Sequence, residues 1–197
     1  MYRIYLFTLL FMPNLVLAKS VLIDSKHSVP SGQVEMRPLQ IQCKNNCYLT
    51  THLVAKKFDE TSKWNSSAMY VFASASGNEG IRYGIKLNKK SLIPEIVVEY
   101  FYSNKESESF VLSESTLGSW EGFKLSWGNG KYQITLLRQE KHEEYSILRD
   151  SGIEHSGNVF FEPETLNYMF IGVDVLQYLD IGEQNVNQEW LKIANSN

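Results

Sequence analysis

Hydrophobic and polar residues alternate along much of the chain, in short runs that end at turn-forming residues. Residues 81–87 alternate strictly, and residues 96–102 form a β-branched and aromatic run. About eleven such runs recur at a spacing of roughly ten residues, and a period of two is typical of β-strands. Residues 177–188 leave room for one helical turn at most. The pattern predicts an all-β fold, an antiparallel two-sheet β-sandwich of jelly-roll type with 10–11 short strands.

One turn is specific enough to predict the pairing of two strands. Asn129 and Gly130 both tolerate positive φ, so they suit a two-residue type I′ turn between residues 123–128 and 131–136. The resulting register places six large side chains on one face, where the core should be. The predicted pairs are Gly128 with Lys131, Trp127 with Tyr132, Leu125 with Ile134, and Phe123 with Leu136.

The first eighteen residues have the features of a secretory signal peptide. Arg3 precedes an apolar stretch over residues 4–17, and Ala18 provides a small residue for cleavage before Lys19. A membrane anchor is the alternative, but it requires ~20 apolar residues. We therefore expect a signal peptide over residues 1–18, a single β-sandwich domain over 19–197, and a secreted, extracellular protein without a transmembrane segment.

Secretion affects how two further motifs are interpreted. Cys43 and Cys47 are the two cysteines of the chain, and an even count in an oxidising compartment favours a disulfide. Two free thiols and a metal site are the alternatives, although a metal needs more ligands than two thiolates. Asn65-Ser66-Ser67 is an N-x-[ST] sequon, which makes Asn65 the predicted glycosylation site.

Composition and charge exclude several classes of protein. With 19 basic and 22 acidic residues the chain has a net charge of −3, so no basic excess suggests nucleic acid or an anionic membrane. Hydrophobic residues make up 43% of the chain, which excludes a disordered tail. We expect no nucleic-acid partner.

Motifs for chemistry are missing from the sequence. The four histidines have no metal-ligand spacing, and neither a nucleophile elbow nor a glycine-rich phosphate or cofactor loop occurs. Glu95 and Glu99 resemble a glycosidase pair on one strand face, but residues four apart on a strand lie ~13 Å apart. A retaining pair needs carboxyl groups ~5 Å apart. We therefore expect no metal, no cofactor and no catalytic residue, and a solvated face for the two glutamates.

The aromatic residues provide candidate ligand contacts. Most share a strand face with aliphatic residues, as core side chains do, but Trp64, Phe101 and Trp120 are less determined by the pattern. Exposed aromatic side chains often dominate binding energy. These three residues are the predicted ligand-binding candidates.

Residues 120–134, which carry the predicted turn, resemble the most recognisable hairpin of the farnesoic acid O-methyltransferase-like domain. That family runs an aromatic, an aliphatic, Ser and Trp into a Gly turn. Residues 82–87 and 168–173 resemble two further strands of the family, although its usual Gly-Trp and Ile-Arg elements are absent. The resemblance implies a β-sandwich that often serves as an extracellular or surface-binding module.

The leading hypothesis from the sequence is a secreted, non-catalytic binding module. Its ligand would be a carbohydrate, a protein surface or a small lipid, and a role as a secreted effector is compatible with this. The first alternative is an enzyme, either a terpenoid acid O-methyltransferase or a hydrolase. The second is a structural extracellular interaction protein.

Overall fold

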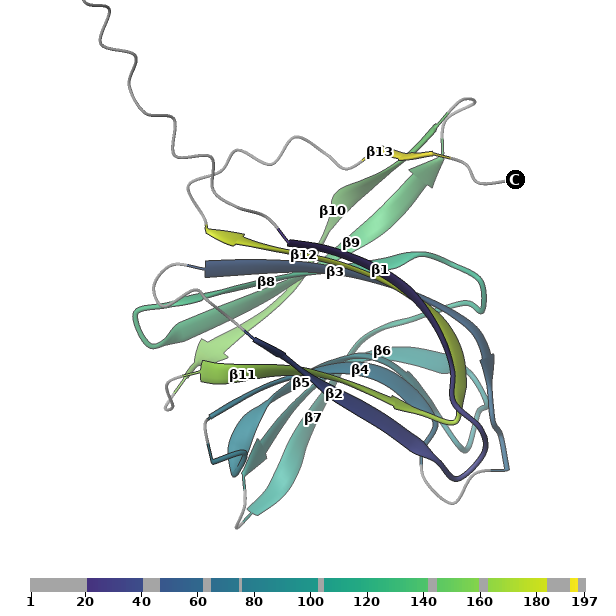
Figure 1. Ribbon diagram of the computed structural model, residues 1–197, viewed down its shortest axis with the longest axis horizontal. Coiled ribbons are helices and arrows are strands. Elements are labelled where there is room, and N and C mark those ends of the chain that lie inside the picture. The colour runs from purple at the N-terminus through teal and green to yellow at the C-terminus, as the bar shows by residue number, and fades with distance from the viewer. Residues whose placement is uncertain are drawn as a thin grey trace, which may run out of the picture.

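The computed structural model describes residues 21–40, 47–61, 65–74, 76–102, 105–141, 145–159, 163–183 and 192–194. These residues form thirteen strands in two sheets that face each other as layers (Figure 1). All strand pairs are antiparallel. The predicted two-sheet β-sandwich is therefore confirmed, with somewhat more strands than the 10–11 expected.

The larger sheet has seven strands. In spatial order they are β1 (Val21–Ser28), β12 (Val173–Glu183), β3 (Cys47–Phe58), β8 (Glu121–Gly128), β9 (Lys131–Lys141), β10 (Tyr145–Asn158) and β13 (Lys192–Ala194). Because β12 continues to Glu183, residues 177–183 belong to a strand and do not form the single helical turn for which the sequence left room.

The smaller sheet has six strands. In spatial order they are β2 (Val34–Gln40), β11 (Pro163–Ile171), β4 (Ser67–Ser74), β5 (Glu79–Leu87), β6 (Pro94–Tyr102) and β7 (Lys105–Glu114). Pro38 lies in β2, which is an edge strand. Proline has no backbone N–H to donate, and an edge strand tolerates it because one side of the strand has no neighbouring strand to accept a hydrogen bond.

The hairpin predicted around Asn129 and Gly130 has the expected turn and register. Both residues have positive φ, 52° and 72°, as a type I′ turn requires. Trp127 pairs with Tyr132, and Leu125 pairs with Ile134. The apolar residues of this hairpin are buried, so the prediction that they form the core is confirmed.

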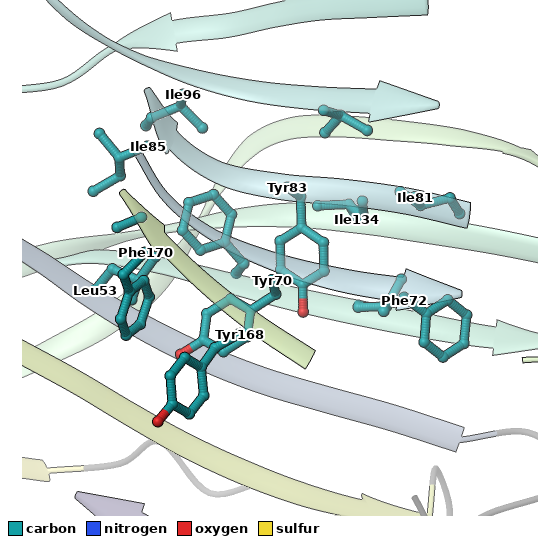
Figure 2. Close-up of a cluster of buried hydrophobic side chains, with 14 of the residues drawn as sticks. Leu53, Tyr70, Phe72, Ile81, Tyr83, Ile85, Ile96, Ile134, Tyr168 and Phe170 are labelled. Atoms are coloured by element: carbon teal, nitrogen blue, oxygen red, sulfur yellow. The ribbon is translucent and has the colours of Figure 1, made fainter. Parts of the chain in front are cut away.

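The core lies between the two sheets and is rich in aromatic residues. Figure 2 shows Leu53 and Ile134 from the larger sheet near Tyr70, Tyr83 and Phe170 from the smaller one. All five are fully buried. Because alternate residues fill this core, the intervening side chains of each strand point to the outer faces of the sandwich.

Candidate functional site

The outer face of the smaller sheet carries charged residues on its two neighbouring strands β5 and β6. Ile81, Tyr83 and Ile85 point into the core, so Arg82 and Lys86 point the other way. In β6, Ile96, Val98 and Tyr100 point inward. By the same alternation β6 presents Glu95, Val97, Glu99 and Phe101 on this outer face.

Glu99 is the centre of an ion-pair network on this face. Its Oε2 lies 3.0 Å from Arg82 Nη2, and its Oε1 accepts a hydrogen bond of 2.6 Å from Lys86 Nζ. Arg82 lies directly opposite Glu99, whereas Lys86 lies opposite Glu95. The Lys86 side chain therefore reaches Glu99 by passing Gly84 and Val97, and Val97 is only 2% exposed.

The Glu99 side chain is only 6% exposed, so the expectation of a solvated glutamate pair is wrong for this residue. Hydrogen bonds between charged groups are the stronger kind, and a buried carboxylate needs such partners. With a cation on each oxygen, Glu99 is suited to hold Arg82 and Lys86 in place.

Phe101 packs beside this network. It lies opposite Gly80 in the register, and a Cβ at Gly80 would come within 2.7 Å of the Phe101 ring. The guanidinium carbon of Arg82 lies 5.2 Å from the centre of the same ring. A cation over an aromatic face is attractive, so Phe101 and Glu99 together fix the Arg82 guanidinium.

A hollow of about 330 Å³ adjoins the network and shares Lys86 and Val97 with it. Seven of its ten lining residues are polar or charged. The lining residues are Asn65, Lys86, Leu87, Asn88, Lys89, Lys90, Glu95, Val97, Ser109 and Val111. We call the hollow together with Arg82, Glu99 and Phe101 the β5–β6 site.

The turn between β5 and β6 forms one wall of the hollow and is held by Asn88. Its Oδ1 accepts hydrogen bonds from the backbone N–H groups of Lys90 and Ser91, at 2.9 and 3.3 Å. Its Nδ2 donates a hydrogen bond of 2.7 Å to Glu95 Oε1. The backbone N–H of Leu92 also donates to the Asn88 carbonyl. These bonds preorganise the wall, so a ligand need not order it.

The β5–β6 site therefore combines donors, acceptors and apolar surface in a small space. Lys86 and Asn88 present N–H donors, while Glu95 presents a half-buried carboxylate that accepts. Val111 is 58% exposed on the opposite wall. Small-molecule sites generally combine a mostly apolar lining with a few fixed polar groups, so this lining is more polar than is usual.

Two of the three predicted ligand-binding aromatics lie in the described part of the chain, and these two do not come together. Phe101 is half-buried in the β5–β6 site, whereas Trp120 is half-buried beside β8 of the larger sheet. The Trp120 ring contacts the buried His52 of β3 edge-on, at 6.5 Å between centres. Trp64 lies outside the described residues. Of the two aromatics that the structure describes, it places Phe101 at the candidate site.

The other predicted sites have different outcomes. Cys43 and the side chain of Cys47 lie outside what the structure describes, so their disulfide stays a prediction. Asn65 is exposed and lies on the wall of the hollow. The described residues include no group of three or more His, Cys, Asp or Glu side chains that would hold a metal. Within the same residues, no helix has the length and apolar character needed to span a membrane.

A second polar cluster links the two sheets at their edge. Ser25 Oγ lies 2.8 Å from His27 Nε2, and His27 Nδ1 lies 3.2 Å from Glu35 Oε1. This order matches a nucleophile, a base and a carboxylate. However, Gln177 Oε1 also lies 3.1 Å from His27 Nε2, and Arg37 also pairs with Glu35. The imidazole is only 10% exposed. The cluster is therefore best suited to clasp β1 to β2.

Sequence reasoning did not identify Arg82 and Lys86 as functional candidates. A signal was present, because both occupy the polar positions of a strictly alternating strand. If residues 81–87 and 96–102 are taken as one hairpin, Arg82 falls opposite Glu99 and Lys86 opposite Glu95, as the structure has them. Opposite charges at paired positions stabilise a hairpin and indicate its register.

Comparisons with known proteins give structural similarities alone. No protein-family model matches the sequence, and no curated protein matches it. The resemblance to the farnesoic acid O-methyltransferase-like domain therefore stays a prediction.

Solved structures with a similar fold include galectins, a carbohydrate-binding module and an enzyme. Galectin LEC-6 of Caenorhabditis elegans has a TM-score of 0.47 at 9% identity, covering 79% of this chain and 94% of the galectin. The carbohydrate-binding module CBM66 of Bacillus subtilis has 0.47 at 7%, covering 80% and 91%. An alginate lyase of Klebsiella pneumoniae has 0.43 at 8%, covering 77% and 60%. Similarity at this level does not determine a ligand.

Proposed function

We propose that the protein is a secreted glycan-binding module and that its ligand occupies the β5–β6 site. The observation that carries the proposal is the preorganised Arg82–Glu99–Lys86 network beside a polar hollow. Sugar hydroxyl groups both donate and accept hydrogen bonds, so they need cations, amides and carboxylates in one place. The hollow offers all three.

The chemistry of the lining favours a sugar over a small lipid. With seven polar or charged residues among ten, an apolar ligand would displace water from these groups without replacing the hydrogen bonds that the water makes. Each hydrogen bond lost in this way costs about 1–3 kcal/mol. A sugar would satisfy the polar groups and place its C–H surface against Val111 and the apolar stem of Lys86.

The same geometry disfavours the hydrolase alternative at this site. Glu99 is held by two cations, and Glu95 accepts a hydrogen bond from Asn88. The two residues lie four positions apart on β6, which separates their backbones by ~13 Å. Neither arrangement suits the pair of carboxyl groups that glycoside hydrolysis needs.

A glycan-array screen of the chain over residues 19–197, followed by calorimetry on the best ligand, tests the proposal. We expect Lys86→Met and Glu95→Gln each to weaken binding at least tenfold. Glu95→Gln should leave the thermal midpoint nearly unchanged, whereas Lys86→Met should lower it, because the buried Glu99 loses one of its two cations. Lys131→Met is the matched control, because Lys131 is exposed on the β8–β9 turn of the other sheet. It should bind as the wild type does.

Two results would contradict the proposal in different ways. If the wild type, expressed without glycosylation, binds no glycan, the function is wrong. If it binds one and the Lys86 and Glu95 variants bind equally well, the site is wrong. Secretion is tested separately, because N-terminal sequencing of protein collected from culture medium should begin at Lys19.

A further inference from the structure

Asn65 combines two features that the proposed function does not use. It is the acceptor of the Asn65-Ser66-Ser67 sequon, and its side chain is exposed. It also lines the hollow of the β5–β6 site. An attached glycan would therefore start at the wall of the cavity that we assign to an external glycan.

The backbone around Asn65 is firmly held, so the origin of such a glycan is fixed. Ser66 Oγ donates a hydrogen bond of 2.6 Å to the carbonyl of Asp59. The Ser66 carbonyl accepts a bond of 2.9 Å from the N–H of Leu87, another lining residue. Ser66 is 1% exposed and Ser67 is 3% exposed. Asn65 therefore stands out from a buried, hydrogen-bonded segment.

Strand order shows where Asn65 stands relative to the rest of the hollow. Asn65 lies two residues before the start of β4, and Ser67 of β4 pairs with Lys86 of β5. The opposite wall comes from Ser109 and Val111 of β7, two strands beyond β5. The hollow thus spans β5 and β6, and a sugar on Asn65 Nδ2 would begin at its β4 side.

We propose that N-glycosylation of Asn65 closes the β5–β6 site to external glycans. The inference rests on the proposed function. The first sugars of the attached glycan occupy the space beside Lys86 and Glu95, where they meet the same donors and acceptors. Because the attached glycan is tethered, its effective concentration at the site is in the millimolar range. The glycosylated chain is then the closed form, and the unglycosylated chain is the form that binds.

Matched glycoforms secreted from eukaryotic cells test this inference. Ser67→Ala removes the sequon and keeps Asn65, and Asn65→Gln removes the acceptor itself. Ser67→Thr keeps the sequon and serves as the control. Mass spectrometry before and after enzymatic deglycosylation measures occupancy. Calorimetry then measures affinity for the glycan selected on the array.

We expect the wild type and Ser67→Thr to carry a glycan on Asn65 and to bind at least tenfold more weakly than Ser67→Ala and Asn65→Gln. Equal affinity of glycosylated and unglycosylated chains would overturn the inference and leave the proposed function intact. An unmodified Asn65 in the secreted wild type would also overturn it. If the unglycosylated variants bind no glycan either, the proposed function and the inference fail together.

Discussion

Protonation of His52 should destabilise the fold at mildly acidic pH. His52 lies on β3, points away from the core cluster and is only 1% exposed, with the Trp120 ring edge-on against it. Burial removes water from the ring and lowers the pKa of His52 from its ordinary value of 6.5 to about 4. The folded chain therefore resists a proton that the unfolded chain accepts.

The sign and size of the effect follow from the two pKa values. Above pH 6.5 His52 is neutral in both states and the free energy of unfolding is unaffected. Below that pH the unfolded state binds the proton first, so stability falls until the folded state also binds it near pH 4. At about 1.4 kcal/mol per pKa unit the full loss is about 3 kcal/mol, of which about 2 kcal/mol is lost by pH 5.

Urea unfolding at pH 7.5 and pH 5, followed by tryptophan fluorescence, measures this loss. Other groups also titrate over this range, so the informative quantity is the difference between the wild type and His52→Gln. We expect the wild type to lose about 2 kcal/mol more than the variant. His155→Gln is the control variant. Burial lowers the pKa of His155 as well, but this residue is only half-buried, whereas His52 is almost completely buried. Equal losses in wild type and His52→Gln would refute the reasoning.

Four further stability predictions concern single positions, each checked by chemical denaturation at pH 7.5. Gly84→Ala should cost more than about 3 kcal/mol, because Gly84 has a φ of +151° and a Cβ would lie 2.2 Å from a backbone carbonyl oxygen. Gly77→Ala, with φ +68° and open space, should cost only about 1 kcal/mol. Leu125→Ala should cost about 3 kcal/mol, because the side chain is fully buried. Glu121→Gln should leave stability unchanged or raise it, because burial raises the pKa of Glu121 and a glutamine oxygen still accepts from Ser115.

Local patterns were sufficient to predict much of the fold. The hairpin at Asn129 and Gly130 depends on two residues that tolerate positive φ and on the alternation that flanks them, and both are visible in the sequence. Strict alternation likewise identified the strand over residues 81–87. These predictions succeed because the partners are close in sequence and one face is buried.

Long-range pairing explains what the sequence pattern missed. The first strand, β1, pairs with β12, so nothing near residues 21–28 indicates its partner. The clasp of His27 and Glu35 also depends on bringing the edges of two sheets together. Strand β10 extends to Asn158 only because its register shifts between Asp150 and Glu154. Such an irregularity has no clear period in the sequence.

For the candidate site, the sequence identified Phe101 and Asn65 but not their shared setting. Phe101 was selected as an aromatic residue and Asn65 as a sequon. Their location near one hollow depends on the order of β4, β5, β6 and β7 in the smaller sheet. Alternation alone shows which residues share a face, whereas the neighbours on that face come from the tertiary fold.

The edge pairing of the two sheets also determines when the fold can be completed during synthesis. Among the described strands, β1 and β2 come first along the chain and leave the ribosome before the others, yet they pair with two of the last described strands, β12 and β11. The β4–β7 and β8–β10 meanders contain their own partners and can form early. Non-local pairings form slowly because a long loop must close first. Until residues 163–183 emerge, β1 and β2 remain unpaired. During this period the chain is most exposed to aggregation and depends most on chaperones.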